Sequence, residues 1–169
     1  MRIILSMLLL TIATQAAAEG TRVEFSSVYT YLARDCHWAH PADDLQEGQD
    51  NALQCQGAGP YLAYIYFSAQ SALLSVQRTD DPDNFVLHPA VDGIDERNGV
   101  VEWRLANGLP FAIIVRSKMF APPEDGGALL TETLEIRGLE KHSDLRKSVD
   151  ARTTPSANEA ARVLADEAY

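Results

Sequence analysis

Two apolar runs separated by Asn107-Gly108 form the clearest pattern in the chain, VVEWRLANGLPFAIIVRS. Asn-Gly is the preferred pair of a two-residue hairpin turn, because both residues tolerate positive φ. The flanking runs are rich in β-branched and aromatic residues, which is typical of strands. The pattern therefore predicts a β-hairpin with strands at 100–106 and 109–118.

A two-residue turn also fixes which residues of the two strands face each other. Counting outward from the turn places Trp103 opposite Ala112 and Val101 opposite Ile114. One strand face is then wholly apolar; it contains Val101, Trp103, Leu105, Ala112 and Ile114. The other face combines Glu102 and Arg104 with Phe111 and Ile113, so we expect it to be only partly buried.

Three further segments have the alternating or β-rich composition of strands. They are 21–33, 61–68 and 71–79, and DDPDN at 80–84 reads as the turn that ends the last of them. ALLTETLEIRGL, which starts at 128, also alternates and follows a Pro- and Gly-containing loop at 121–127. We expect it to return beside the second strand of the hairpin, giving a three-stranded antiparallel meander.

The period of the hydrophobic pattern changes near the C-terminus, where apolar residues recur at helical spacing between 157 and 168. Ser156 precedes Glu159 by three residues, which is a capping-box pattern. The chain is therefore predicted to be an α+β protein with a mainly antiparallel sheet and a C-terminal helix. The alternative is a β-sandwich or small barrel with a peripheral helix.

The N-terminal segment has the pattern of a secretory signal peptide. Arg2 precedes an apolar stretch that is too short to span a bilayer, and Ala16-Ala17-Ala18 fits an A-x-A cleavage site. Residues 1–18 are therefore predicted to be removed, which leaves 19–169 as a single domain in the periplasm or outside the cell.

The chain contains two cysteines, Cys36 and Cys55. In an oxidising compartment two cysteines on nearby segments usually pair, so we expect a disulfide that staples the domain. The polar stretch between them, with Pro41 and Gly48, reads as a surface loop.

The stretch DCHWAHPADD, residues 35–44, also resembles a metal site. His37 and His40 are three residues apart, with Asp43 and Asp44 nearby. A disulfide removes the Cys36 sulfur as a ligand, and Pro41 works against the helix that would bring both imidazoles to one side. We expect exposed loop histidines, with no metal and no cofactor.

The formal net charge of −10 narrows the possible partners. A negative field repels phosphate backbones and anionic lipid head groups, so nucleic acid and membrane surfaces are poor partners. It attracts cationic proteins.

No hydrolase or metalloprotease motif is present in the sequence. The carboxylate pairs Asp80/Asp83 and Asp92/Asp95 have the composition of solvated turns. We therefore expect a non-catalytic module that binds a protein or small ligand. The candidate contact residues are Trp38, Tyr61, Tyr64 and Tyr66, although core and sheet-face packing is the more usual role of such residues. Two alternatives are a periplasmic inhibitor of a cationic hydrolase such as lysozyme, and a hydrolytic enzyme.

Four pieces of the sequence resemble a family of small exported proteins of Gram-negative bacteria. They are VYTYL, CQGAGPYLAYI, VEWRLANGLPFAIIVR and VDARTTPSANEAARVLADEAY. The resemblance implies export but no activity, cofactor or site residue. Members of that family often carry a second cysteine pair near the C-terminal helix, and this sequence has no cysteine after Cys55.

Overall fold

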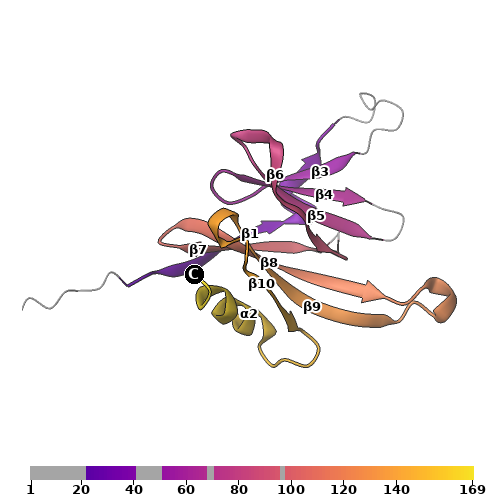
Figure 1. Cartoon of the computed structure of the whole chain (residues 1–169). Helices are drawn as coiled ribbons and strands as arrows, with labels where there is room; N and C mark the ends of the chain where they lie inside the picture. The colour runs from indigo at the N-terminus through magenta and orange to yellow at the C-terminus, as the bar shows by residue number, and fades with distance from the viewer. Residues whose placement is uncertain (1–21, 41–50, 68–70, 96–97) are drawn as a thin grey trace, which may run out of the picture.

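The chain folds into two five-stranded antiparallel sheets and a C-terminal helix (Figure 1). This computed structural model describes residues 22–40, 51–67, 71–95 and 98–169. The predicted signal peptide, residues 1–18, lies outside the described residues, as do Asp43 and Asp44. The predicted α+β class, with mainly antiparallel strands and a C-terminal helix, is confirmed.

Sheet A combines the N-terminal strand with the C-terminal half of the chain, in the order β1-β7-β8-β9-β10. Its strands are β1 (Phe25–Tyr31), β7 (Val100–Ala106), β8 (Leu109–Phe120), β9 (Leu129–Gly138) and β10 (Arg146–Asp150). Strands β7, β8 and β9 form the predicted meander, and β1 pairs antiparallel with the free edge of β7. A single helical turn, α1 (Leu32–Asp35), then carries the chain from sheet A to the other sheet.

Sheet B is a simple meander in which each strand pairs with its neighbours in sequence. Its strands are β2 (Cys36–Trp38), β3 (Ala52–Gln56), β4 (Tyr61–Phe67), β5 (Ala72–Arg78) and β6 (Asp81–Asp92). The strands predicted at 61–68 and 71–79 are confirmed. The turn predicted at 80–84 is wrong, because Arg78 already pairs with Asp81 and most of that segment belongs to β6.

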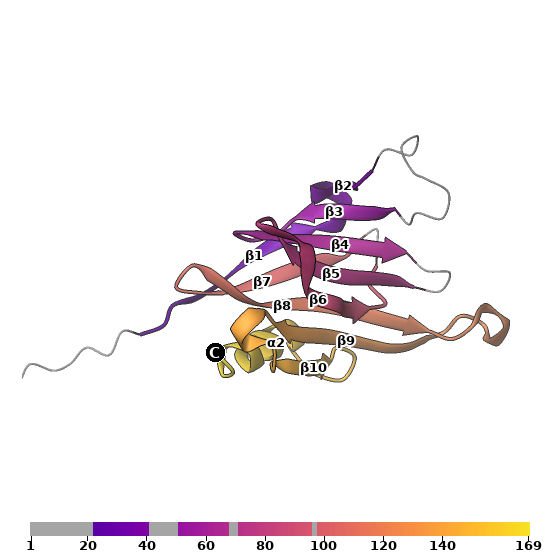
Figure 2. The ribbon, with the colours of Figure 1, turned by 45° about the horizontal axis from the view of Figure 1, so that its top comes forward.

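The two sheets pack face to face around one apolar core, as Figures 1 and 2 show. Sheet B contributes Ile65, Leu74 and Val76, and sheet A contributes Trp103 and Val115; all are fully buried. Burial of this kind is the main favourable contribution to folding. The described strands form two separate sheets and do not close into a barrel.

Helix α2 (Ala157–Asp166) covers the opposite face of sheet A and makes a third layer (Figure 1). Its buried positions, Ala157, Ala161 and Ala165, carry small side chains that allow the helix to lie close to the strands. Strand β7 and the central part of β8, residues 111–115, are therefore buried on both faces. The expectation that the Glu102–Arg104 face is only partly buried is wrong, because α2 covers it.

The hairpin turn is confirmed, but the predicted register is wrong beyond it. Asn107 and Gly108 have the positive φ values of the turn, and Leu105 pairs with Pro110. A bulge then shifts the pairing, so that Trp103 lies opposite Ile113 instead of Ala112. A bulge places one extra residue on one strand. Every residue of that strand beyond the bulge therefore lies on the opposite face from the one that a bulge-free register predicts. Ala112 and Ile114 consequently face α2.

The predicted capping box at the start of α2 is also wrong. Ser156 has a φ of 51°, and its side chain makes no capping hydrogen bond. Only its backbone carbonyl participates, accepting hydrogen bonds from the N–H groups of Glu159 and Ala160. The helix itself lies where the pattern predicted it and ends at Asp166 instead of 168.

The predicted disulfide is confirmed. Cys36 and Cys55 are directly opposite each other in the β2–β3 pair, with Cα atoms 4.1 Å apart. The bridge fastens the short edge strand β2 to sheet B. None of the helices in the described ranges is long and apolar enough to cross a membrane.

Candidate functional site

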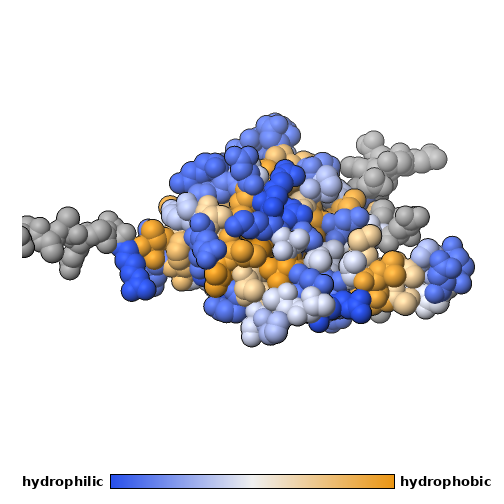
Figure 3. All heavy atoms as spheres, turned by 60° about the horizontal axis from the view of Figure 1, so that its bottom comes forward, coloured by the Kyte–Doolittle hydropathy of each residue, from blue (hydrophilic) through white to orange (hydrophobic). Residues whose placement is uncertain are grey.

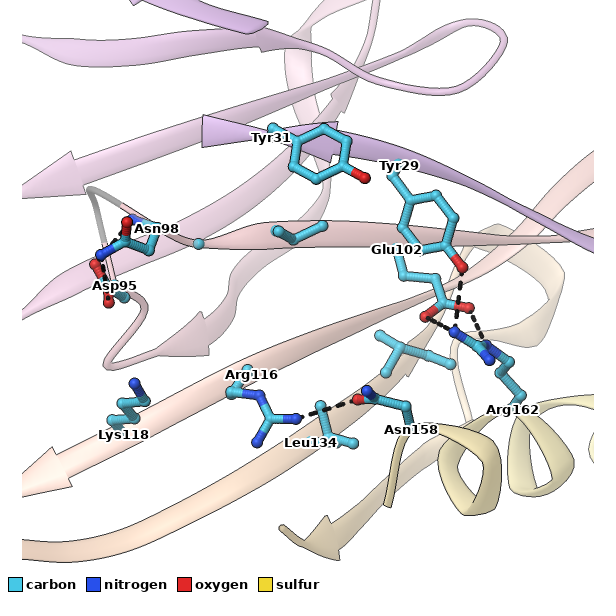
Figure 4. A pocket seen from close by; sticks show the side chains of 13 residues that line it. Tyr29, Tyr31, Asp95, Asn98, Glu102, Arg116, Lys118, Leu134, Asn158 and Arg162 are labelled. Carbon is cyan, nitrogen blue, oxygen red and sulfur yellow. Dashed lines mark hydrogen bonds and ion pairs between the residues drawn. The ribbon is translucent and has the colours of Figure 1, made fainter. Parts of the chain in front are cut away.

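A polar groove lies on the helix side of sheet A, between strand β1 and the first turns of α2 (Figure 4). It encloses about 320 Å³, which is within the usual range for small-ligand sites. Tyr29 and Tyr31 form one wall from β1, and Arg116 and Lys118 project from β8. We refer to this hollow as the groove.

One end of the groove is closed by an ion pair between Glu102 of β7 and Arg162 of α2. The Nε and Nη2 atoms of Arg162 donate to the two carboxylate oxygens, at 2.7 and 3.2 Å. Nη2 also donates to the Tyr29 hydroxyl oxygen at 3.1 Å. Hydrogen bonding to Glu102 raises the pKa of the Arg162 guanidinium above its ordinary value.

The same network continues beneath β1 and fixes the helix on the sheet. Ser27 donates a 2.6 Å hydrogen bond to Glu102 and accepts one of 2.9 Å from Arg104. Arg104 in turn holds Asp166, near the end of α2, by two hydrogen bonds of 2.6 and 2.7 Å. Each buried charge in this network has an opposite partner, which is the condition for keeping charges at low exposure.

The opposite side of the groove is rich in hydrogen-bond donors. Arg116 uses one N–H on the Glu132 carboxylate at 2.9 Å and another on the Asn158 side-chain oxygen at 3.2 Å. Asn158 therefore points its amide NH₂ away from Arg116. Within the described part of the chain, the half-buried Lys118 ammonium forms no hydrogen bond or ion pair. Figure 4 shows Lys118 on the side of the groove where Asp95 lies, and Asp95 is held by hydrogen bonds from Asn98.

After these internal pairings, the groove has more donors than acceptors to offer a ligand. The carboxylates of Glu102 and Glu132 are neutralised by Arg162 and Arg116, whereas Lys118 keeps its charge. The Ser27 hydroxyl donates to Glu102 and accepts from Arg104, and the Glu102 carboxylate is already ion-paired with Arg162. The groove is consequently suited to holding an acceptor-rich group.

Two of the predicted contact residues lie on a different surface, the outer face of sheet B. Tyr64 and Tyr66 have ring centroids 6.3 Å apart, and Phe85 and His88 of β6 complete an aromatic cluster. Burial raises the pKa of both tyrosine hydroxyls above the ordinary value. The cluster forms a half-exposed aromatic surface.

The other two predicted contact residues are separate from that surface. Tyr61 points into the core, since alternate residues of a strand face opposite sides of a sheet. Its ring stacks on Trp103, and its hydroxyl donates to Glu140 at 2.8 Å. Burial raises the pKa of Tyr61 to about 12. Trp38 is exposed at the end of sheet B, with its ring centroid 5.6 Å from that of Phe67. The structure therefore does not bring the four predicted residues together.

The remaining candidates from the sequence are dispersed. His37 and His40 lie on the exposed side of β2 and beyond its end, and no group of three or more potential metal ligands occurs among the described residues. Asp80 forms an ion pair with Arg78, and their hydrogen bond lowers the pKa of the carboxyl. Asp95 alone of the four aspartates considered earlier lines the groove.

The sequence contained one signal for the groove. Glu102 and Arg104 are charged residues at alternate positions of an otherwise apolar strand, and such charges require partners when they are buried. Their partners, Arg162 and Asp166, lie in the C-terminal helix about 60 residues away, where nothing in the local pattern marks them.

Comparisons with family models, with curated proteins and with solved structures found no match to this chain.

Proposed function

We propose that the chain is an exported, non-catalytic binding protein that holds a small oxyanionic ligand in the groove. The observation that carries the proposal is the set of donors on one side, where Lys118 has no ion-pair partner among the described residues while the carboxylates of Glu102 and Glu132 are already paired. A carboxylate or phosphate group offers acceptors to the Lys118 ammonium.

The opposite wall adds a surface for a flat or apolar portion of the ligand. The rings of Tyr29 and Tyr31 are exposed and have centroids 6.4 Å apart, as expected for alternate residues on one strand face. The Tyr29 hydroxyl is fixed by Arg162, so this wall is ordered before any ligand arrives. Pre-ordering reduces the entropic cost of binding.

Binding to the groove can be measured by calorimetric titration with benzoate, which carries a carboxylate on a ring, and with inorganic phosphate. We expect Lys118→Met to weaken binding about tenfold, or about 1.4 kcal/mol, because it removes the unpaired cation.

The matched control is Lys147→Met, which removes an equal charge from β10, outside the groove. It should leave the affinity for both probes unchanged. Absence of saturable binding to either probe, or equal affinities for the Lys118 and Lys147 variants, contradicts the proposal.

The exported location is supported by the Cys36–Cys55 disulfide, because such bonds persist in oxidising compartments. The resemblance to small exported proteins of Gram-negative bacteria agrees with it and stays a prediction. When the full chain is expressed in a Gram-negative host, we expect intact-mass analysis of the periplasmic fraction to find a protein that begins at Glu19 and has no free thiol. Recovery of the uncleaved chain in the cytoplasm with two free thiols contradicts export.

The alternative of a hydrolytic enzyme has less support. Ser27 and Glu102, the hydroxyl and carboxylate beside the groove, are held by Arg104 and Arg162 in a network that fixes α2. The alternative of an inhibitor of a cationic hydrolase does not depend on the groove.

A further inference from the structure

Strands β8 and β9 extend beyond their neighbours as a two-stranded projection, which we call the arm (residues 119–131). Pairing of β8 with β7 stops at Val115, and pairing of β9 with β10 stops at Thr133, whereas β8 and β9 pair with each other as far as Phe120 and Leu129. Figures 1 and 2 both show this hairpin projecting past sheet B and α2.

The arm combines exposed apolar side chains with an acidic tip. Met119, Phe120 and Leu130 are each more than half exposed, at 59, 58 and 54 %. Glu124 and Asp125 at the tip are the only charged residues between Met119 and Thr131. Figure 3 shows an apolar surface on the projecting end of the molecule, with hydrophilic atoms beyond it. Exposed apolar patches bordered by charge are typical of interaction sites.

The tip is a closed turn with its own hydrogen bonds. The backbone N–H groups of Asp125 and Gly127 both donate to the Pro122 carbonyl, and Ala121 N–H donates to the Ala128 carbonyl. On the β9 side of the arm, Arg152 donates to the carbonyls of Leu129 and Leu130. An arm held by these hydrogen bonds loses little conformational freedom on docking.

Charge decides which partner the arm fits. A second copy of the chain carries the same net charge of −10 and the same acidic tip, so electrostatic repulsion opposes self-association through this surface. A positively charged partner is attracted over a long range, and its encounter is accelerated. A narrow arm also fits a cleft better than a flat surface.

We propose that the arm is a docking element that inserts its apolar sides and acidic tip into the cleft of a cationic protein. This inference adds a second surface to the proposed binding role, and it rests on that role only in treating the chain as a binding protein. It also provides a mechanism for the alternative function, inhibition of a cationic hydrolase. An arm that occupies the substrate cleft of the hydrolase excludes its substrate.

The probe is purified lysozyme, a cationic enzyme with an open substrate cleft, titrated against the full-length mature protein. We expect Met119→Ser/Phe120→Ser and Glu124→Gln/Asp125→Asn each to weaken binding at least tenfold. Salt and acetylation of the lysozyme lysines should weaken binding by the unmodified arm, and lysozyme activity should fall stoichiometrically when the arm is intact.

Two control variants carry equivalent changes elsewhere. Leu109→Ser alters an exposed apolar residue at the far end of β8, and Asp83→Asn/Asp144→Asn removes two exposed charges away from the arm. Both should bind lysozyme as the parent protein does. All variants should keep the parent melting temperature, since none of the altered side chains is buried.

The inference is overturned if lysozyme does not bind, if the arm and control variants bind equally, or if the arm variants instead abolish a dimer seen by sedimentation at high salt. Titration of the same variants with benzoate separates the two proposals. If the arm variants no longer bind lysozyme but still bind benzoate, both the arm proposal and the groove proposal are supported. If lysozyme binding depends on the arm but benzoate does not bind at all, only the groove proposal is refuted.

Discussion

Replacing Trp103 with alanine is expected to lower the free energy of unfolding by about 3–5 kcal/mol, the usual cost of truncating a buried aromatic side chain. Trp103 is fully buried between the two sheets and stacks on Tyr61. Its indole N–H donates a 2.9 Å hydrogen bond to Thr30, which itself donates to the Gln56 carbonyl. The side chain thus joins β7, β1 and β3, and its loss leaves a cavity where both sheets meet.

Urea denaturation of two variants provides the measurement and its control. Trp38→Ala removes the same side chain from an exposed position and should cost less than about 1 kcal/mol, as surface substitutions usually do. If the two alanine substitutions lower the free energy of unfolding equally, Trp103 is not central to the core.

Loss of the Cys36–Cys55 disulfide is expected to lower the free energy of unfolding by about 3 kcal/mol. The bond closes a loop with a sequence separation of 19 residues, and the chain-entropy model assigns about this value to a loop of that length. Strand β2 has only three residues and pairs with β3 alone, so little else holds it on sheet B. We expect β2 to detach when the bond is reduced, before the rest of the core unfolds.

The measurement compares oxidised protein, reduced protein and Cys36→Ala/Cys55→Ala in denaturant, with hydrogen exchange to locate the change. Reduction keeps both sulfur atoms, so the difference between the reduced protein and the double variant isolates the packing of the fully buried Cys55. Two results would contradict this prediction. One is a decrease in the free energy of unfolding of less than about 1 kcal/mol on reduction, and the other is a hydrogen-exchange rate that rises equally in β7 and β2.

Local patterns predicted the elements whose partners are close in sequence. The Asn107-Gly108 turn, β4, β5 and α2 follow from turn chemistry and periodicity. The register of the hairpin could not be obtained in this way. Its bulge next to Phe111 allows β8 to present Ile113 to one core and Ala112 to the other, and that requirement arises only when both faces of the strand are covered.

Elements with distant partners were harder to predict. Strand β3 has little apolar pattern of its own and is defined by pairing with β4 and by the disulfide. The pairing of β1 with β7 joins segments that no local rule connects. Ser156 failed as a cap because its φ of 51° turns the side chain away from the helix, which its residue type does not reveal.

The groove could not be predicted from the sequence for the same reason, because its residues are distant from one another along the chain. Its sides come from β1, β7, β8 and α2, so no contiguous motif contains it. Patterns along the sequence pointed instead to Tyr61, Tyr64 and Tyr66, which share a strand, although Tyr61 lies on the opposite face from the other two. Spacing along a strand shows which side chains share a face, whereas the assembly of a site depends on tertiary contacts.

The separation of β1 from β7 has a consequence for the order in which the chain acquires structure. If the polypeptide emerges from a translocation channel N-terminus first, the sheet B meander can form hairpin by hairpin as each strand appears, because local contacts form fastest. The first strand must wait until Val100 has emerged to meet Tyr31. During that interval the inner face of the meander, with Ile65 and Leu74, remains uncovered, so this is the stage at which chaperone protection matters most.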